Sequence, residues 1–546
     1  MDIHTIKKLE TKAAKSSQPD FFKLGIALTF MLAVLWYAFG AQNVTNNAFL
    51  AIAAVFGAYM ALNIGANDVA NNVGPAVGSK ALTMGGAIII AAIFETSGAL
   101  IAGGDVVSTI KKGIIDPALF VNSQEFIWAM TAALLAGGIW LNLATKVGAP
   151  VSTTHSIVGG VMGGGIAAAG FSIVSWITMG KIAASWIISP VLGAIIAATF
   201  LYSLKKTILY QEDRIEAMRK MVPIYVAIMA FAFVTYLTLK GLKKIWPSVL
   251  ETINSLTPFT FEVVKKPTLF FALSLGLIAA IITYFIVKPL VKKASKNLAN
   301  TAKDANSLFT IPLIFAAALL SFAHGANDVA NAVGPLAAIA DAIQNSAISS
   351  KAAIPLWVML IGAIGISLGL ALYGPKLIRT VGSEITELNQ IRAYSVAMAA
   401  AITVIIASQL GLPVSSTHIA IGGIFGVGFL REYLSTTTAQ ERIEAEEAQL
   451  QEDKQIKKLY KTELNELKSL DNHSNEELSR MEELKMLIDI EEETIKAEKK
   501  HLKRAKKAQY VKRSAIMKII AAWLITVPAA AMIAALVFYI IKTMMV

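Results

Sequence analysis

The chain has 546 residues, a formal net charge of +12, no cysteine, 16% charged residues and 55% hydrophobic residues. Soluble proteins carry about 25% charged residues, so this composition and a mean hydropathy of +0.60 exclude a soluble globular protein. The lack of cysteine excludes disulfides and thiolate metal sites. The positive charge lies in loops beside apolar stretches, where a lipid bilayer places it, and does not indicate binding to nucleic acid.

Eleven apolar stretches approach the roughly 20 residues that a helix needs to cross a bilayer. They are predicted near 23–41, 48–66, 85–104, 125–144, 184–204, 221–239, 268–287, 308–325, 354–373, 392–410 and 515–543. We expect the first to be an uncleaved helix, because its apolar run is longer than that of a typical signal peptide. Two shorter runs, 156–170 and 419–430, follow polar motifs and are predicted to be half-helices.

Two polar motifs each occur twice within this apolar sequence. Gly-Ala-Asn-Asp-Val-Ala-Asn at 65–71 returns at 325–331, displaced by 260 residues. Pro-Val-Ser-Thr-Thr-His at 150–155 returns as Pro-Val-Ser-Ser-Thr-His at 413–418, displaced by 263 residues. Nearly equal displacements imply that the whole intervening unit is duplicated. The predicted fold is an all-α polytopic membrane protein with two homologous, inverted repeats and discontinuous helices.

The repeats also predict how the chain is divided. We expect an N-terminal tail with the first transmembrane helix, repeat 1, a connecting transmembrane segment and repeat 2, at 1–47, 48–205, 206–307 and 308–546. Residues 431–513, within repeat 2, are polar and rich in Glu and Lys, with leucines spaced three and four apart. This pattern predicts an antiparallel helical hairpin, a coiled coil outside the bilayer. The insert is either a solvated spacer or a surface for an unknown protein partner or gate regulator.

The Asn-Asp motif carries an aspartate to membrane depth, where such residues mark pathways for ions and polar solutes. Gly65, Gly74 and Pro75 predict a helix break that frees backbone groups, and the second motif has the same pattern. Side-chain oxygens add the ligands that hard cations require. The candidate cation-binding residues are Asp68, Asn71, Asp328 and Asn331, and Asn67 and Asn327 are candidates for an anion. The alternative is that these residues only cap helices.

The Pro-Val-Ser motifs predict the opposite chemistry. Consecutive hydroxyl residues after a proline and before a glycine-rich run are typical of a helix N-terminus, where free amides and the helix dipole favour an anion. The candidate ligands of a tetrahedral oxyanion are Ser152, Thr153, Thr154, Ser415, Ser416 and Thr417. His155 and His418 either donate to the anion or anchor the half-helices.

Glu95 lies inside an apolar span, and the aligned residue of repeat 2 is Gly362. A buried carboxylate requires a cation, a proton or a hydrogen-bond donor. We expect Glu95 to help couple the cation to the anion, and a purely structural hydrogen bond is the alternative.

These motifs resemble those of the PiT inorganic phosphate transporter family. The likeness rests on the two paired motifs, on Phe94-Glu95-Thr96, and on Lys-Ile-x-Ala-x-Trp before the last helix of each repeat. It implies uptake of inorganic phosphate with a co-transported cation, sodium or a proton, and no other cofactor. It also implies a multi-pass protein of the plasma membrane (the inner membrane of a Gram-negative cell), often a homodimer. Eukaryotic relatives have an essential glutamate where this chain has Ala397, which leaves sodium and proton both open.

The choice of anion needs a separate argument, since some relatives resemble sulfate permeases. Near neutral pH phosphate keeps a proton that a carboxylate accepts, whereas sulfate does not, so Asp68, Asp328 or Glu95 facing the anion favours phosphate. A sulfate permease of the same fold and a passive anion channel are the alternatives. The chain has no Walker loop and no metalloprotease histidine pair, so nothing indicates an enzyme.

Overall fold

The computed structural model describes residues 3–40, 47–243, 245–256, 258, 262, 264–345, 354–383, 388–469, 474–506 and 513–545. In these ranges, eleven helical segments are long and apolar enough to cross a membrane. They are Asp20–Gly40, Ala48–Gly78, Met84–Ala102, Ser123–Val147, Trp176–Leu209, Arg214–Gly241, Leu269–Ala294, Ala302–Asn345, Leu356–Tyr373, Gln390–Gln409 and Ile520–Met545. The prediction of an all-α polytopic membrane protein is confirmed. By its contacts the chain divides into one unit of Met1–Val427 with Arg513–Val546 and another of Gly428–Lys512.

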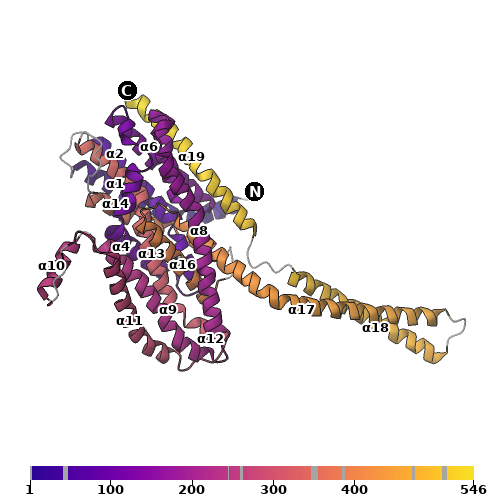
Figure 1. Cartoon of the computed structure of the whole chain (residues 1–546). Coiled ribbons are helices and arrows are strands. Elements are labelled where there is room, and N and C mark those ends of the chain that lie inside the picture. Colours follow the sequence, from indigo (N-terminus) through magenta and orange to yellow (C-terminus); the bar gives the residue numbers. More distant parts are fainter. Residues whose placement is uncertain are drawn as a thin grey trace. The chain divides into compact units, whose positions relative to one another are not determined.

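The first helix and repeat 1 account for the first eight α-helices (Figure 1). They are α1 (Ile3–Gly40), α2 (Asn47–Asn67), α3 (Ala70–Gly78), α4 (Met84–Ala102), α5 (Gly104–Lys112), α6 (Ser123–Val147), α7 (Thr153–Ala169) and α8 (Trp176–Leu204). Short 3₁₀ turns, η1 (Pro117–Leu119) and η2 (Phe171–Ile173), flank α6 and α7, and a π-helical turn, η3 (Lys205–Leu209), extends α8. α7 has 17 residues, so it is too short to span, as predicted for a half-helix.

Four helices connect the repeats, and a similar series forms repeat 2. The connecting helices are α9 (Arg214–Tyr236), extended by the π-helical turn η4 (Leu237–Gly241), α10 (Trp246–Leu256), α11 (Leu269–Ala294) and α12 (Ala302–Ser307). Repeat 2 contains α13 (Thr310–Asn345), α14 (Leu356–Tyr373), α15 (Pro375–Ser383), α16 (Gln390–Gln409), α17 (Ser416–Lys468), α18 (Asn475–Lys506) and α19 (Arg513–Met545). The predicted half-helix 419–430 does not end at 430: α17 continues to Lys468, and residues 431–468 contain no Gly or Pro that would end it.

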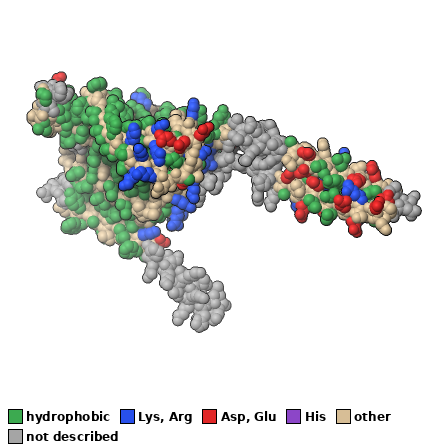
Figure 2. Space-filling model, turned by 90° about the horizontal axis from the view of Figure 1, so that it is seen from below, with side chains coloured by type: hydrophobic (Ala, Val, Ile, Leu, Met, Phe, Trp, Pro, Cys, Tyr) green, Lys and Arg blue, Asp and Glu red, His purple; other side chains and the backbone are tan. Residues whose placement is uncertain are grey.

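The core of the membrane unit lies around α2, α6, α13 and α16. Two-thirds or more of the residues in the most apolar window of each of these spans are buried, whereas α1 and α11 bury less than a fifth. Apolar side chains dominate much of the surface seen in Figure 2, and Lys and Arg gather on the end of the bundle that faces the viewer. An apolar surface with charges at one end is what a bilayer requires of the helices that it surrounds.

The helix break predicted for the Asn-Asp motif is present in repeat 1 and absent from repeat 2. In repeat 1 it falls at Asp68 and Val69, upstream of Pro75, which lies inside α3. The Asn71 side-chain amide donates to the Asp68 carbonyl (2.8 Å) and occupies an acceptor that a regular helix offers to Asn72. The Asn72 N–H therefore bonds to Val69 instead. In repeat 2 the Asn331 amide points elsewhere and α13 runs unbroken through Pro335, so the prediction of a second break was wrong.

The motif glycines let neighbouring helices cross at backbone contact. A Cβ on Gly65 would collide with the backbone of Ile366 in α14, and one on Gly325 would collide with the backbone of Glu95 in α4. Gly74 faces Val381 of α15, and Gly334 faces Ile110 of α5, so each short helix covers the second half of one motif. The crossing at Gly325 places Glu95 of α4 directly beside α13.

The second unit, Gly428–Lys512, contains the end of α17 and all of α18, which pack side by side as a hairpin. Leu464, Leu484 and Ile488 form its apolar centre. Lys457 donates to Glu492 at 2.8 Å, and this hydrogen bond lowers the pKa of the Glu492 carboxyl below its ordinary value. The two helices are thus held by a small core and by ion pairs at the surface.

Candidate functional site

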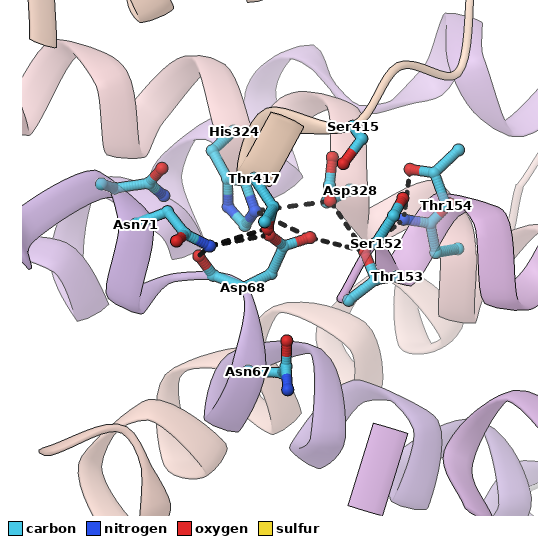
Figure 3. Close-up of polar contacts among 12 residues, drawn as sticks. Asn67, Asp68, Asn71, Ser152, Thr153, Thr154, His324, Asp328, Ser415 and Thr417 are labelled. Carbon is cyan, nitrogen blue, oxygen red and sulfur yellow. Dashed lines mark hydrogen bonds and ion pairs between the residues drawn. The ribbon is translucent and has the colours of Figure 1, made fainter. Parts of the chain in front are cut away.

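Four segments from the two repeats meet inside the membrane unit (Figure 3). They are the turn between α2 and α3, the middle of α13, and the first residues of α7 and α17. The turn brings Asp68, α13 brings Asp328, and the two half-helix starts bring Thr153 and Thr417. All four side chains are at most 1% exposed, so the sequence motifs converge in a buried polar site.

Thr153 lies between the two carboxylates. Its Oγ1 is 2.7 Å from Asp68 Oδ2 and 2.9 Å from Asp328 Oδ2. A hydroxyl has one hydrogen, so it donates to only one of these oxygens at a time. The hydroxyl oxygen then lies close to the second carboxylate oxygen with no hydrogen between them. Since two buried carboxylates also repel each other, the arrangement requires a proton or a cation nearby.

The asparagines reach across from one repeat to the other. Asn71 of repeat 1 donates to Thr417 Oγ1 of repeat 2 at 2.7 Å. Asn331 of repeat 2 donates to Thr154 Oγ1 of repeat 1 at 3.2 Å, and also to Thr153 at 3.1 Å. Thr417 in turn bonds to Asp68. Asn71 and Asn331, like Thr154 and Thr417, are equivalent positions, so the contacts are reciprocal.

A histidine that the sequence reasoning missed connects the aspartates to Glu95. His324 Nε2 is 3.4 Å from Asp328 Oδ2 and 3.9 Å from Asp68 Oδ2, and Nδ1 is 2.6 Å from Glu95 Oε2. Asn72, also missed, donates to Glu95 Oε1 at 2.7 Å. Glu95 therefore has two side-chain partners. The available signal was that His324 lies in an apolar span, four residues before Asp328 on one helix face.

Several buried oxygens of the site have no hydrogen-bond partner within the described part of the chain. They are Asn71 Oδ1, Asn331 Oδ1, Asp328 Oδ1 and Ser416 Oγ. An unpartnered buried polar atom is costly, and oxygen atoms are the ligands that hard cations prefer. Asp68, His324 and Asp328 also each offer a ligand atom within 4.8 Å of the others. The residues present thus fit a cation held by carboxylate, amide and hydroxyl oxygens.

Asn67 at the end of α2 and Asn327 within α13, both predicted to face an anion, bond through their side chains to the segments that precede α7 and α17. Asn67 donates to Thr145 Oγ1 (2.9 Å) and to the Ala149 carbonyl (3.2 Å), and accepts from the Val151 N–H. Asn327 makes the equivalent bonds, to Ser408 Oγ and the Leu412 carbonyl. In Figure 3 Asn67 lies apart from the Asp68 cluster. Binding of an anion by these two residues stays a prediction.

The Pro-Val-Ser motifs begin helices, as predicted. The hydroxyls of Ser152 and Ser415 accept from the backbone N–H of His155 and His418, three residues on, which caps α7 and α17. The two histidine rings meet edge to face, with their centroids 4.5 Å apart, and His155 also contacts Trp186. The rings thus lie against each other and an indole. Their choice between anion donor and helix anchor stays a prediction.

Comparisons with known proteins agree with this geometry. A model described as the phosphate transporter family matches residues 64–534. A protein of Helicobacter pylori named "Putative phosphate permease" is 48% identical over 98% of both chains. A protein of Haemophilus influenzae with the same name is 40% identical over 70% of this chain and 87% of its own. The Helicobacter alignment is long enough to take in most of the hairpin region.

One solved structure is also similar. It is described as "The sodium-dependent phosphate transporter" and matches with a TM-score of 0.69 and 30% sequence identity. The match covers 91% of this chain and 99% of that one. The chain therefore shares both its sequence and its fold with proteins described as phosphate transporters or phosphate permeases.

Proposed function

Because the chain belongs to the phosphate transporter family, whose members are plasma-membrane permeases and not enzymes, we propose that it moves inorganic phosphate by symport with a cation through alternating access. One observation carries this proposal: a single hydroxyl, Thr153, lies between carboxylates contributed by the two repeats. The arrangement needs an added positive charge, and the half-helices beside it offer donors to an anion.

The cation belongs at the Asn-Asp motifs. Asp68 and Asp328 carry negative charge into a buried site, where unpaired charges are expensive. The unpartnered amide oxygens of Asn71 and Asn331 supply further ligands beside them. A sodium ion held there neutralises a carboxylate and satisfies these oxygens together.

The phosphate belongs at the starts of α7 and α17. Each start presents free backbone amides and the positive end of a helix dipole, together with hydroxyl donors. The residues that we assign to it are Ser152, Thr153, Thr154, Ser415, Ser416 and Thr417. Asn67 and Asn327 position these starts through the preceding turns, because their side chains bond to those turns.

Coupling follows from charge. Phosphate and the aspartates repel each other in a medium of low dielectric, and a bound cation offsets that repulsion. The anion therefore binds well only when the cation is present. Mutual dependence of this kind moves the two solutes together when the repeats change their exposure from one side of the membrane to the other.

Sodium is the coupling ion that we favour. The similar solved structure is described as sodium-dependent, and the oxygen-rich ligand set suits a hard cation. A proton is the second candidate, because the carboxylate of Glu95 is linked to both aspartates through His324. Uptake of radiolabelled phosphate into proteoliposomes, with sodium and pH gradients imposed separately, distinguishes the two. Uptake driven by a pH gradient alone would reject sodium.

Asp68→Asn and Asp328→Asn test the site directly. We expect each to abolish concentrative phosphate uptake, because the amide keeps the shape and removes the charge that holds the cation. Asp116→Asn is the matched control, since Asp116 is exposed and caps a short turn outside the site. Circular dichroism and size-exclusion chromatography establish that the variants are folded. Normal uptake by both site variants would disprove the assignment, and uptake without a cation gradient would indicate a channel.

A further inference from the structure

A cavity of about 500 Å³ opens beside the site on one side of repeat 1. Its wall is formed by residues of α1, α2 and α6 and by the junction of α14 and α15. The volume admits an oxyanion with water, whose share of liquid volume is ~30 Å³ per molecule. The cavity lies wholly within the membrane unit and includes none of the aspartates of the site.

Positive charge dominates the lining. Lys23, Lys146 and Lys376 line the cavity together with one carboxylate, Asp20. Asp20 lies 3.9 Å from Lys23, and three lysines therefore share the described lining with a single carboxylate. Lys376 Nζ donates to the Lys146 carbonyl at 2.9 Å, which keeps these two lysine residues adjacent. A cleft with charges of one sign concentrates ions of the other sign.

Polar residues continue from the lysines to the site. Asn63 and Asn142 line the cavity and are hydrogen-bonded to each other at 3.3 Å. Thr145 also lines it, and its hydroxyl accepts from the Asn67 amide at 2.9 Å. Asn67 immediately precedes Asp68 in the chain. The Asn67–Thr145 hydrogen bond thus connects the cavity wall to the residue that precedes Asp68.

This polar lining is specific to repeat 1. At the displacements of the two motifs, Asn63 corresponds to Ala323, Asn142 to Ile405 and Lys146 to Gln409. A feature needed only for the duplicated fold would recur in both copies. The lysine and the two asparagines are therefore found in repeat 1 alone, as expected of a cavity that serves one side of the membrane.

The lysines also indicate which side that is. Lys23 lies at the start of the apolar span Asp20–Gly40, Lys146 at the end of α6 and Lys376 at the start of α15. The part of α1 that precedes this apolar span adds Lys7, Lys8, Lys12 and Lys15. Short segments rich in Lys and Arg remain on the cytoplasmic side of membrane proteins.

From these observations we propose that the cavity is a cytoplasmic vestibule that binds inorganic phosphate on its way between the Asp68 site and the cytoplasm. The vestibule rests on the proposed function and adds a second, weaker phosphate site to it. The lysines hold the anion by charge, and Asn63 and Asn142 supply hydrogen-bond donors. An anionic lipid headgroup shares this phosphoryl chemistry, and the experiment separates the two sources.

The test uses the fact that the natural chain contains no cysteine. Leu24→Cys introduces a thiol in the cavity wall, and Phe21→Cys introduces one on the same helix outside the wall. Membrane-impermeant thiol reagents are applied to inside-out and right-side-out vesicles. We expect the Leu24→Cys thiol to react only in inside-out vesicles, and inorganic phosphate to slow this reaction at least threefold more than sulfate of equal ionic strength. Phosphate should not affect Phe21→Cys.

The lysines are then tested in the Leu24→Cys background. Lys146→Gln with Lys376→Gln should raise the phosphate concentration that gives half protection by roughly tenfold, because each exposed charge contributes modestly. Lys292→Gln, an exposed lysine on α11 away from the cavity, is the control.

Three results would overturn the vestibule: no protection by phosphate, reaction from the outside only, or protection that follows the anionic lipid content and not phosphate. Phosphate uptake by the same vesicles is measured in parallel. If phosphate does not protect the Leu24→Cys thiol while uptake is intact, the vestibule alone is rejected. If the unmodified protein takes up no phosphate, the proposed function is rejected.

Discussion

At the scale of single residues, the site is organised around the Thr153 hydroxyl. It contacts both aspartates and accepts from Asn331, so its three side-chain partners come from both repeats. No other side chain described in the structure is hydrogen-bonded to both Asp68 and Asp328 through one oxygen. Loss of this hydroxyl should therefore affect both halves of the molecule together.

Thr153→Val removes the hydroxyl and keeps the shape of the side chain. Two buried carboxylate oxygens and one amide then lose a partner, which costs about 1–3 kcal/mol. We expect phosphate uptake to fall about tenfold to a hundredfold in proteoliposomes. Thr153→Ser keeps the hydroxyl and should retain most of the uptake. Equal losses in the two variants would show that the hydroxyl is not what matters.

Sequence patterns predicted which polar residues would converge, and the structure brings Asp68, Asn71, Asp328 and Thr153 together as expected. His324 and Asn72 were missed because they occur in one repeat only, so the duplication gave no signal for them. The bonding of Asn67 to a turn could not be foreseen either. Which way an amide points depends on helix packing, and motif spacing does not record it.

At the scale of elements, glycines decide how closely helices approach. Gly325 of α13 touches the α4 backbone at Glu95, and Gly98 of α4 touches the α13 backbone at Phe322. This double contact holds Glu95 against His324. The glycines of the motif predict a helix break, whereas in the structure they allow neighbouring helices to cross at backbone contact.

Gly325→Ala should therefore destabilise the protein. The added Cβ meets backbone, which cannot move aside as a flexible side chain can, and such overpacking costs about 1–3 kcal/mol. We expect a lower midpoint of thermal unfolding in detergent. Gly25→Ala is the control, since nothing lies within 4 Å of the Cβ that it would add. An unchanged midpoint for Gly325→Ala would contradict the crossing.

The hairpin offers an element-level test of the spacer hypothesis. Leu484 is fully buried in its centre, so Leu484→Ala should destabilise the hairpin by about 2–4 kcal/mol. We expect faster proteolysis within 428–512 and unchanged phosphate uptake. Met486→Ala, at an exposed position of the same helix, should change neither. A fall in uptake with Leu484→Ala would favour a gate regulator over a spacer.

At the scale of the whole molecule, the sequence was sufficient for the class of fold and the number of spans. It could not fix helix ends, because α7 and α17 start at motifs that read alike and stop after very different lengths. The inverted orientation of the repeats stays a prediction, supported by the reciprocal contacts of Asn71 and Asn331. The homodimer and a protein partner at 431–513 also stay predictions.

Inversion makes a simple prediction about exposure. Ala48 and Ser307 lie near the start of the first helix of each repeat, and both are exposed. In inverted repeats, Ala48→Cys and Ser307→Cys should react with an impermeant thiol reagent from opposite sides of the membrane. Reaction from the same side would mean that the repeats are parallel.

Asn71 and Asn331 occupy identical heptapeptides. Asn71 donates to the carbonyl three residues before it, and its helix is interrupted there, whereas Asn331 donates to Thr153 and Thr154 and α13 continues. Each sequence must therefore be able to adopt both shapes. If alternating access exchanges the two repeats, we expect a second state in which α13 is interrupted at Asp328 and α2 continues into α3. In that state Asn331 would hold the Asp328 carbonyl, and the two faces of the protein would exchange their forms.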